Sequence, residues 1–341
     1  MRAPFALPLA ALAVAATAAS AQTPVPPPAA APAQAPTGPA ADCDRLAAHP
    51  LDPDRRAAAG VMMEAIDPAA ALAACEAATA AEPAAARLWF QWARALEAAG
   101  RDADAAERYR RAAQFGSVAA MSNLGLMLME GRGVATDVPA GIEWIRRAAE
   151  RAYPPAQVSL GSLHEDGRFL QRSDAEAARW YRSAADAGDP SGQNAIAWML
   201  EQGRGVARDE AEAERYYRLA AEQNYAEALN NLAWFLNARG REPEEARAFA
   251  TRAFEAQPDN PAFADTLAAV LIDQGYPAEA LPLAQFAAEQ EPGNAEYHER
   301  RGDALWGIER GADARAAWQR ALELATSDTQ RRRLQQKIER Q

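Results

Sequence analysis

The chain is poor in the residues that most catalytic and nucleic-acid-binding sites need. Its 341 residues include three histidines, two cysteines and a single lysine, and acidic residues exceed basic ones, which gives a net charge of −11. Binding to phosphate backbones requires a basic stripe, and an acidic chain with interspersed charges does not provide one. We therefore expect no nucleic-acid partner.

Signatures of catalysis and metal binding are also missing. The histidines His49, His164 and His298 lie far apart in the sequence, and no metalloprotease, serine-hydrolase or P-loop motif is present. A metal could bind the consecutive residues His164, Glu165 and Asp166, but such a trio is more typical of a solvent-facing helix end. We expect no enzyme activity, no cofactor and no metal.

Only one long apolar run occurs, and it stands at the amino terminus. It extends from Ala3 to Ala19, contains two prolines, follows Arg2 and precedes a small-residue cleavage site that ends at Ala21. This pattern is typical of a cleaved secretory signal over the first 21 residues, with an uncleaved anchor as the alternative. The mature chain is thus expected to be periplasmic or secreted, without an integral membrane span.

Residues 22–41 consist almost entirely of Ala, Pro, Thr and Gln, and this composition cannot bury a core. We interpret the segment as an extended spacer, with a proline-rich ligand for a partner as the alternative. The two cysteines, Cys43 and Cys75, follow it. In an oxidising compartment they are expected to form a structural disulfide that closes the first repeat, because their spacing does not fit a redox-active pair.

The middle of the chain repeats every 36 residues. Three glycine-containing loops begin at Gly131, Gly167 and Gly203, and Trp144, Trp180 and Tyr216 keep the same step. Within each copy the apolar residues fall in two blocks at helical spacing, which predicts two antiparallel helices per repeat. The residues Asp137, Asp174 and Asp209 precede the second block of their copies and are expected to favour the start of a helix.

The pattern of Leu-Gly, Gly-x-Gly-Val and then Trp or Tyr with Ala-Ala resembles Sel1-like repeats, and the flanking segments resemble tetratricopeptide repeats. This resemblance implies an all-α fold, an α-solenoid or superhelix of stacked helix pairs. The chain is expected to begin with a signal peptide (1–21), a linker (22–41) and an N-terminal capping segment (42–85) that contains the Cys pair and a degenerate repeat from Asp52. These are followed by one tetratricopeptide-like repeat (86–117), three Sel1-like repeats (118–225), three tetratricopeptide repeats (226–326) and a C-terminal capping helix (327–341).

In the last segment, Ser327 and Asp328 are expected to cap a helix from Thr329 to Gln341. Its apolar residues Leu334 and Ile338 are expected to pack on the final repeat, while its arginines Arg331, Arg332, Arg333 and Arg340 stay in water. A terminal repeat needs such a polar outer face.

A partner is expected on the face formed by the first helices. The candidate binding residues occupy the fifth, ninth and twelfth positions of two successive copies, and are Asn194, Trp198, Glu201, Asn230, Trp234 and Asn237. Tryptophan offers apolar area with one donor, and asparagine can bond both groups of a peptide backbone. The alternative is that both tryptophans pack against neighbouring repeats. Phe90 and Arg94 hold the fifth and ninth positions of an earlier copy.

These expectations favour a non-catalytic protein-interaction scaffold or adaptor in the cell envelope, whose partner is a peptide segment or a protein domain. The alternative is a regulator or positioning factor of cell-wall enzymes that touches glycan and associates with peptidoglycan. A third class follows from cysteine-rich Sel1-like proteins, which have been described as binding or hydrolysing β-lactams. That subgroup carries a cysteine pair in every repeat, and the central repeats of this chain have none.

Overall fold

The computed structural model describes residues 37–57 and 59–339, so the expected signal peptide and most of the expected linker lie outside the described residues. Residues from Gly38 onward form one compact unit. The described residues contain seventeen α-helices, one short 3-10 helix and no strand. The predicted all-α fold is confirmed.

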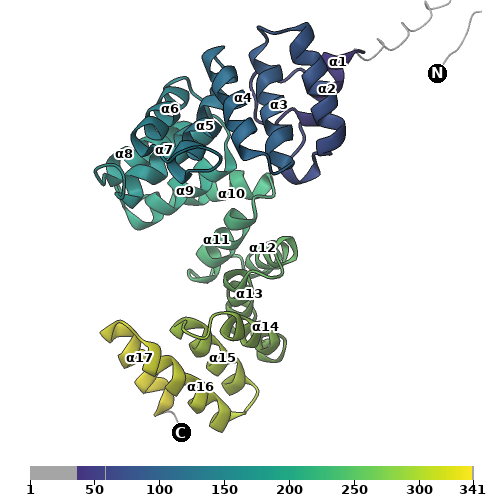
Figure 1. Ribbon diagram of the computed structural model, residues 1–341. Helices are drawn as coiled ribbons and strands as arrows, with labels where there is room; N and C mark the ends of the chain where they lie inside the picture. The colour runs from purple at the N-terminus through teal and green to yellow at the C-terminus, as the bar shows by residue number, and fades with distance from the viewer. Residues whose placement is uncertain (1–36, 58, 340–341) are drawn as a thin grey trace, which may run out of the picture. The chain divides into compact units, whose positions relative to one another are not determined.

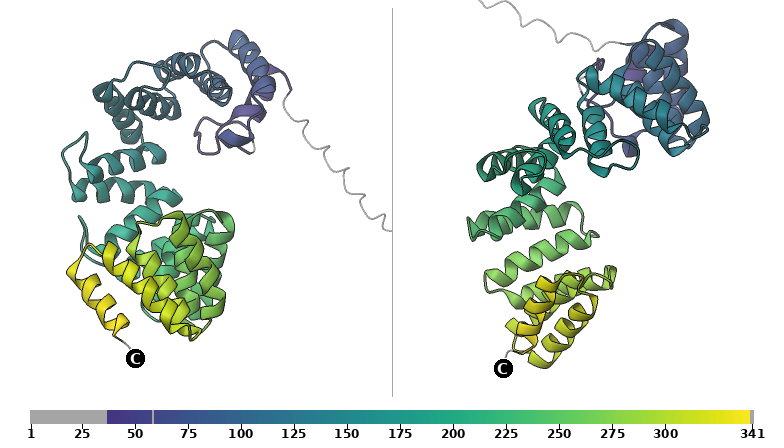
Figure 2. Two further views of the ribbon diagram at one scale, coloured as in Figure 1. Left: turned by 60° about the horizontal axis from the view of Figure 1, so that its bottom comes forward. Right: turned by 90° about the vertical axis from the view of Figure 1, so that its left-hand side faces the viewer.

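Most of the helices form consecutive pairs that stack on one another (Figures 1 and 2). The first helices are α3 (Ala86–Ala98), α5 (Val118–Glu130), α7 (Pro154–Asp166), α9 (Pro190–Gln202), α11 (Ala226–Asn237), α13 (Pro261–Asp273) and α15 (Ala295–Gly307). The second helices are α4 (Asp102–Gln114), α6 (Val138–Glu150), α8 (Asp174–Asp186), α10 (Glu210–Glu222), α12 (Pro243–Ala256), α14 (Pro277–Gln290) and α16 (Gly311–Leu324). The ends are formed by α1 (Pro39–Ala47), the 3-10 helix η1 (Met63–Ala65), α2 (Pro68–Ala81) and α17 (Asp328–Ile338).

Each second helix from α4 to α14 packs on the first helix of the following pair. From α5 onward, each first helix also packs on the next first helix. The first helices therefore share one side of the stack, continuous from α5 to α15, which we call the first-helix face; α3 holds the corresponding place in the first pair. The architecture is an α-solenoid of stacked helix pairs, as the repeat predicted.

The ends of the central helices follow from single residues. Gly131, Gly167 and Gly203 each end a first helix in the left-handed conformation, where glycine has no steric penalty. Asp137 and Asp209 cap second helices by accepting backbone N–H bonds. In the copy between them the cap is the hydroxyl of Ser173, and Asp174 is already the first residue of the helix. The sequence expectation for that copy is therefore one residue off.

Small residues let neighbouring helices approach closely. A Cβ atom at Gly161 would lie 2.7 Å from the ring of Tyr181, and one at Gly302 would lie 2.4 Å from the ring of Trp318. Both aromatic side chains are buried, and buried alanines fill many of the remaining contacts along the stack. The space that glycine or alanine leaves is thus filled by a large ring from the second helix.

The amino-terminal end is closed by the predicted disulfide. Cys43 on α1 and Cys75 on α2 are joined, with their Cα atoms 4.7 Å apart. Two boundaries differ from the expectation. The helix α1 starts at Pro39, inside the expected linker, because proline fits the first turn of a helix. The expected degenerate repeat from Asp52 lacks a first helix, since the described residues between α1 and η1 form turns.

The carboxyl-terminal end is closed by α17, which Ser327 caps. Leu334 is buried and Ile338 packs beside it, as predicted. Arg333 is not simply solvated, because it bonds the buried carboxylate of Glu299 at 2.6 Å. The chain's single lysine, Lys337, bonds Glu299 as well, at 2.7 Å. Arg340 lies outside the described residues.

Candidate functional site

The two predicted tryptophans lie in different surroundings on the first-helix face. Trp198 of α9 is half-buried and packs against the core of the central repeats. The guanidinium of Arg204 lies 4.7 Å from the centre of its ring. Trp234 of α11 is 44% exposed. These positions favour packing as the role of Trp198, and they leave Trp234 as the exposed aromatic of the pair.

A hollow of about 350 Å³ begins at Trp234. It is lined further by charged residues from α13, α15 and α17, which are Asp273, Glu296, Glu299, Arg300, Asp303, Arg333 and Lys337. Arg300 lies 5.8 Å from the centre of the Trp234 ring. The hollow therefore offers one apolar surface beside carboxylates and guanidinium groups, an arrangement that suits the mixed polarity of a polypeptide.

The predicted asparagines are linked to one another or to a neighbouring helix. Asn231 donates to the side-chain oxygen of Asn194 at 3.0 Å, and Asn230 donates to Asn231 at 3.3 Å. Asn237 donates to Asp273 at 2.7 Å. Asn231 thus connects two of the expected residues, and neither the 36-residue step nor the residue type indicated this.

Glu201, the remaining predicted residue, is engaged inside the fold. Its carboxylate accepts the hydroxyl of Tyr217 at 3.1 Å and pairs with Arg239 at 3.3 Å. Burial, together with the charge of Glu201, raises the pKa of Tyr217 well above its ordinary value, so the tyrosine stays a neutral donor. A tyrosine, a glutamate and an arginine from three different elements meet here.

At the amino-terminal end the first-helix face is occupied by the chain itself. Arg94, at the ninth position of α3, donates to the backbone oxygens of Ala47 and Val61, both at 2.7 Å. Phe90 is buried against Tyr109. Of the two residues expected as weaker candidates for a partner, Arg94 is therefore covered by the end of α1 and the segment that follows it, and Phe90 is buried against α4.

This covered region contains a buried carboxyl group. Asp52 accepts the amide of Asp54 at 3.0 Å and is otherwise removed from water. Burial raises its pKa to about 6, and the nearby charge of Arg94 only partly opposes that effect. Burial and the same arginine lower the pKa of His49 to about 4.

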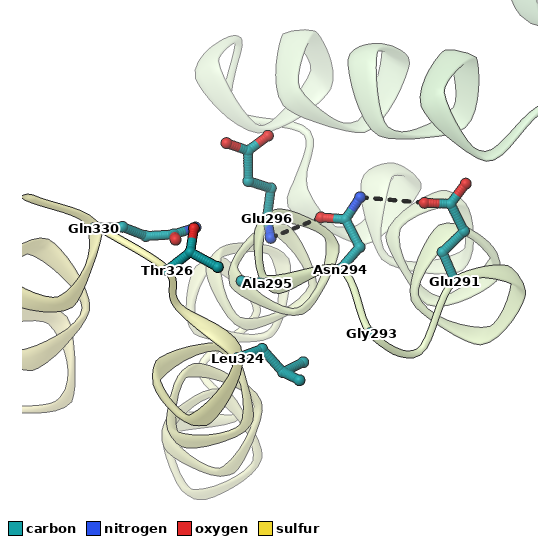
Figure 3. A pocket seen from close by; sticks show the side chains of 8 residues that line it. All are labelled: Glu291, Gly293, Asn294, Ala295, Glu296, Leu324, Thr326 and Gln330. Carbon is teal, nitrogen blue, oxygen red and sulfur yellow. Dashed lines mark hydrogen bonds between the residues drawn. The ribbon is translucent and has the colours of Figure 1, made fainter. Parts of the chain in front are cut away.

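Another hollow, of about 480 Å³, lies between the α14–α15 loop and the connection to α17 (Figure 3). Asn294 caps α15 by accepting the backbone amide of Glu296 at 3.0 Å. Its side-chain amide also donates to the carboxylate of Glu291 at 3.3 Å. The polar groups labelled there include this helix cap and the side chains of Thr326 and Gln330.

Within residues 37–57 and 59–339, no three side chains of His, Cys, Asp and Glu gather as they would around a metal ion. His164 lies near the backbone oxygen of Gln171, and His298 lies near that of Pro292. No helix in the same part of the chain is long and apolar enough to span a membrane.

Comparison with known families identifies the repeats. The Sel1 repeat model matches residues 118–153, 154–189 and 190–225, and the model of a tetratricopeptide repeat-like domain matches residues 263–340. A comparison with curated proteins finds no match.

Two solved structures are similar to the chain over much of its length. The first is a protective antigen of uropathogenic Escherichia coli strains that displays an SLR fold, with 25% identity, a TM-score of 0.56 and coverage of 78% of this chain and 63% of that one. The second is a Sel1 repeat protein from Oxalobacter formigenes, with 26% identity, a TM-score of 0.51 and coverage of 66% of this chain and 89% of that one. The chain therefore spans less than two thirds of the antigen. On its repeats and its fold, the chain is a Sel1-like and tetratricopeptide repeat protein.

Proposed function

We propose that this protein is an exported, non-catalytic scaffold that holds a polypeptide segment of an envelope partner on its first-helix face. The observation that carries the proposal is the chain's own segment at Arg94. There a side chain at the ninth position of a first helix binds two backbone carbonyls, that of Ala47 at the end of α1 and that of Val61 in the irregular segment that follows. Backbone carbonyls are present in every polypeptide, so the same mode of binding is available to a partner.

Farther along the face, the ninth position is held by Trp234, which no segment of the described chain covers to the same degree. An indole ring contributes a large apolar contact at little entropic cost, and aromatic anchors dominate the energy of many interfaces. The neighbouring carboxylates and guanidinium groups can bond the polar groups of a bound segment. We place the principal contact of the partner at this hollow, with Asn194 and Asn230 flanking it on the amino-terminal side.

Export is part of the same proposal and rests on two features. The amino terminus has the charged start, apolar run and small-residue site of a secretory signal. The bond between Cys43 and Cys75 is compatible with an oxidising compartment.

A second candidate is a positioning factor for cell-wall enzymes that also touches glycan. The exposed Trp234 ring beside Asp273 favours it, because a flat aromatic face next to hydrogen-bond acceptors also suits a sugar ring. Sedimentation of the purified protein with peptidoglycan, in the absence of other proteins, supports this candidate if Trp234→Ala abolishes it.

The test of the main proposal is a crosslinked pull-down of the mature protein from its own envelope fraction. The Trp234→Ala variant is compared with Phe115→Ala, which removes an equally exposed aromatic (39%) from the α4–α5 connection. We expect a protein partner that the first variant loses and the second retains, with helical content and melting unchanged. A partner retained by Trp234→Ala would place the binding surface elsewhere, and the absence of any partner would contradict the scaffold proposal.

A further inference from the structure

A polar contact recurs along the stack. In each complete set, a tyrosine of the second helix donates to a glutamate at the twelfth position of the first helix, and an arginine from the loop of the next repeat pairs with that glutamate. The three sets are Tyr109–Glu97–Arg132, Tyr181–Glu165–Arg204 and Tyr217–Glu201–Arg239. In them the tyrosine hydroxyl lies 2.6, 2.9 and 3.1 Å from the carboxylate, respectively.

The set between the first two is absent, because apolar residues hold its positions. The 36-residue step places Met129 where the others have glutamate and Ile145 where they have tyrosine. Arg168 is the corresponding loop arginine. It forms no ion pair within the described part of the chain, and its guanidinium lies 4.8 Å from the ring centre of its neighbour Phe169.

The loop that carries Arg168 differs as well. In the flanking copies the third loop residue is Gly133 or Gly205, and a Cβ atom there would lie 2.3 or 2.1 Å from the backbone at the start of a preceding second helix. The equivalent residue here is Phe169, whose side chain rules out such a close approach and is 40% exposed. Three departures from the repeat therefore fall at one place.

The three departing residues, Met129, Ile145 and Phe169, line a cavity. The cavity has a volume of about 340 Å³ and is lined chiefly by Leu126, Met129, Ile145, Val158, Leu163 and Phe169. In another protein, an apolar cavity of about 150 Å³ is enough to bind benzene. The present cavity can therefore accept a leucine or phenylalanine side chain. Leu126 occupies the ninth position of α5, the position that Trp234 has in α11, so the cavity opens on the first-helix face.

The charges at the cavity indicate what enters it. Asp166 and Arg168 also line it, and both are exposed. Arg168 lacks the carboxylate that its counterparts have, so it can pair with a carboxylate from outside, while Asp166 can accept an N–H group. A free fatty acid would match the apolar lining and Arg168 but would place its only polar group near Asp166. A polypeptide supplies a carboxylate and backbone N–H groups together.

We propose that this cavity binds a bulky apolar side chain of the partner polypeptide, and that Arg168 binds an aspartate or glutamate beside it. The inference rests on the proposed scaffold function and adds a recognition motif to it: a leucine, phenylalanine or methionine next to an acidic residue. The partner thereby has a second anchor in the Sel1-like repeats, in addition to its contact with the hollow at Trp234.

The chain itself supplies the variant that tests this. Met129→Glu, Ile145→Tyr and Phe169→Gly together rebuild the set found in the next copy, which gives Arg168 a carboxylate and replaces three apolar side chains of the cavity lining. Gly125 already lies against Ile145 as Gly161 lies against Tyr181, so the tyrosine has the neighbour that it has elsewhere in the fold. A single exposed change, Arg168→Glu, tests the same site without altering the core. Its matched control is Arg172→Glu in the same loop, 64% exposed and outside the cavity.

The probe is a phage-displayed library of random dodecapeptides selected on the whole mature chain, followed by anisotropy titrations of the selected peptides. We expect the apolar–acidic motif among them. The triple variant should weaken binding by about 30-fold or more, as loss of an interface anchor does. Arg168→Glu should weaken it by about tenfold, and Arg172→Glu by less than about twofold.

Peptides that bind the triple variant as tightly as the wild type would overturn the inference, and so would a selection that yields no peptide. Displacement of the peptides by dodecanoate, with tight binding of dodecanoate alone and no apolar–acidic motif, would assign the cavity to a lipid and also overturn it. Peptides lost only on Trp234→Ala would refute this cavity as the anchor while leaving the scaffold proposal intact.

Discussion

Breaking the disulfide between Cys43 and Cys75 should loosen the amino-terminal end and leave the rest of the stack unchanged. The two residues are 32 apart in the sequence. For a loop of that length, the chain-entropy relation gives about 12 cal/mol/K, which is about 3.7 kcal/mol at 25 °C. The contacts that remain on α1 include the bond from Gln91 to Asp44 at 2.8 Å and those from Arg94. We therefore expect α1 to open more often rather than to stay detached.

The assay is native-state hydrogen exchange on the Cys43→Ala/Cys75→Ala variant and on the reduced wild type, because a stacked-repeat chain need not unfold in a single two-state step. Amides of α1 and α2 should exchange up to about 500-fold faster, since each 1.36 kcal/mol is a factor of ten. Amides of α13 and α15 should not change. Equal acceleration along the whole chain would refute the idea of a local cap, and unchanged exchange in α1 would refute the entropic estimate.

Three further perturbations probe the pH response, the close contacts and the carboxyl-terminal end. Burial raises the pKa of Asp52 to about 6, so the stability of the folded cap that goes with protonated Asp52 is present at low pH and is lost as the pH rises from about 4 to about 6. Relative to Asp52→Asn, the wild-type cap should lose up to about 3 kcal/mol over that window in exchange measurements. Parallel curves of stability against pH for the two proteins would contradict this. Gly302→Ala places a Cβ atom 2.4 Å from the Trp318 ring and should cost about 1–3 kcal/mol in urea unfolding; an unchanged midpoint would mean that the ring can move aside. Lys337→Met leaves the buried carboxylate of Glu299 with one cation fewer, and should destabilise the docking of α17 by about 1–3 kcal/mol, measured as faster hydrogen exchange in α17. Unchanged exchange in α17 would assign its docking to the apolar contacts alone.

The helical repeat was predictable because its signal is redundant. Glycines at Gly131, Gly167 and Gly203 end the first helices of the three central repeats, and the same 36-residue step relates apolar and small residues within those repeats. The disulfide followed from the presence of only two cysteines near one end. The missing first helix after Asp52 was harder to foresee, because spacing alone does not show that buried Arg94 binds this segment in an irregular conformation.

The binding face was only partly predictable. Helical periodicity placed Glu201 on the same face as Trp198, but it could not show that Tyr217 and Arg239 occupy its carboxylate, since these come from other elements. A signal for such sets was nevertheless present, because the glutamate and tyrosine recur at fixed positions of the repeat. The departure at Met129 was visible in the same alignment of copies, whereas the cavity it leaves required the packed side chains.

The measurement that tests the account most directly is photo-crosslinking from the first-helix face in living cells. The residue Trp234 is replaced by p-benzoylphenylalanine, and Phe115 is replaced in the same way as the control. We expect irradiation to join a partner polypeptide to position 234 and not to position 115. Crosslinks of equal yield at both positions, or none at position 234, would contradict the claim that the partner contacts the first-helix face at Trp234.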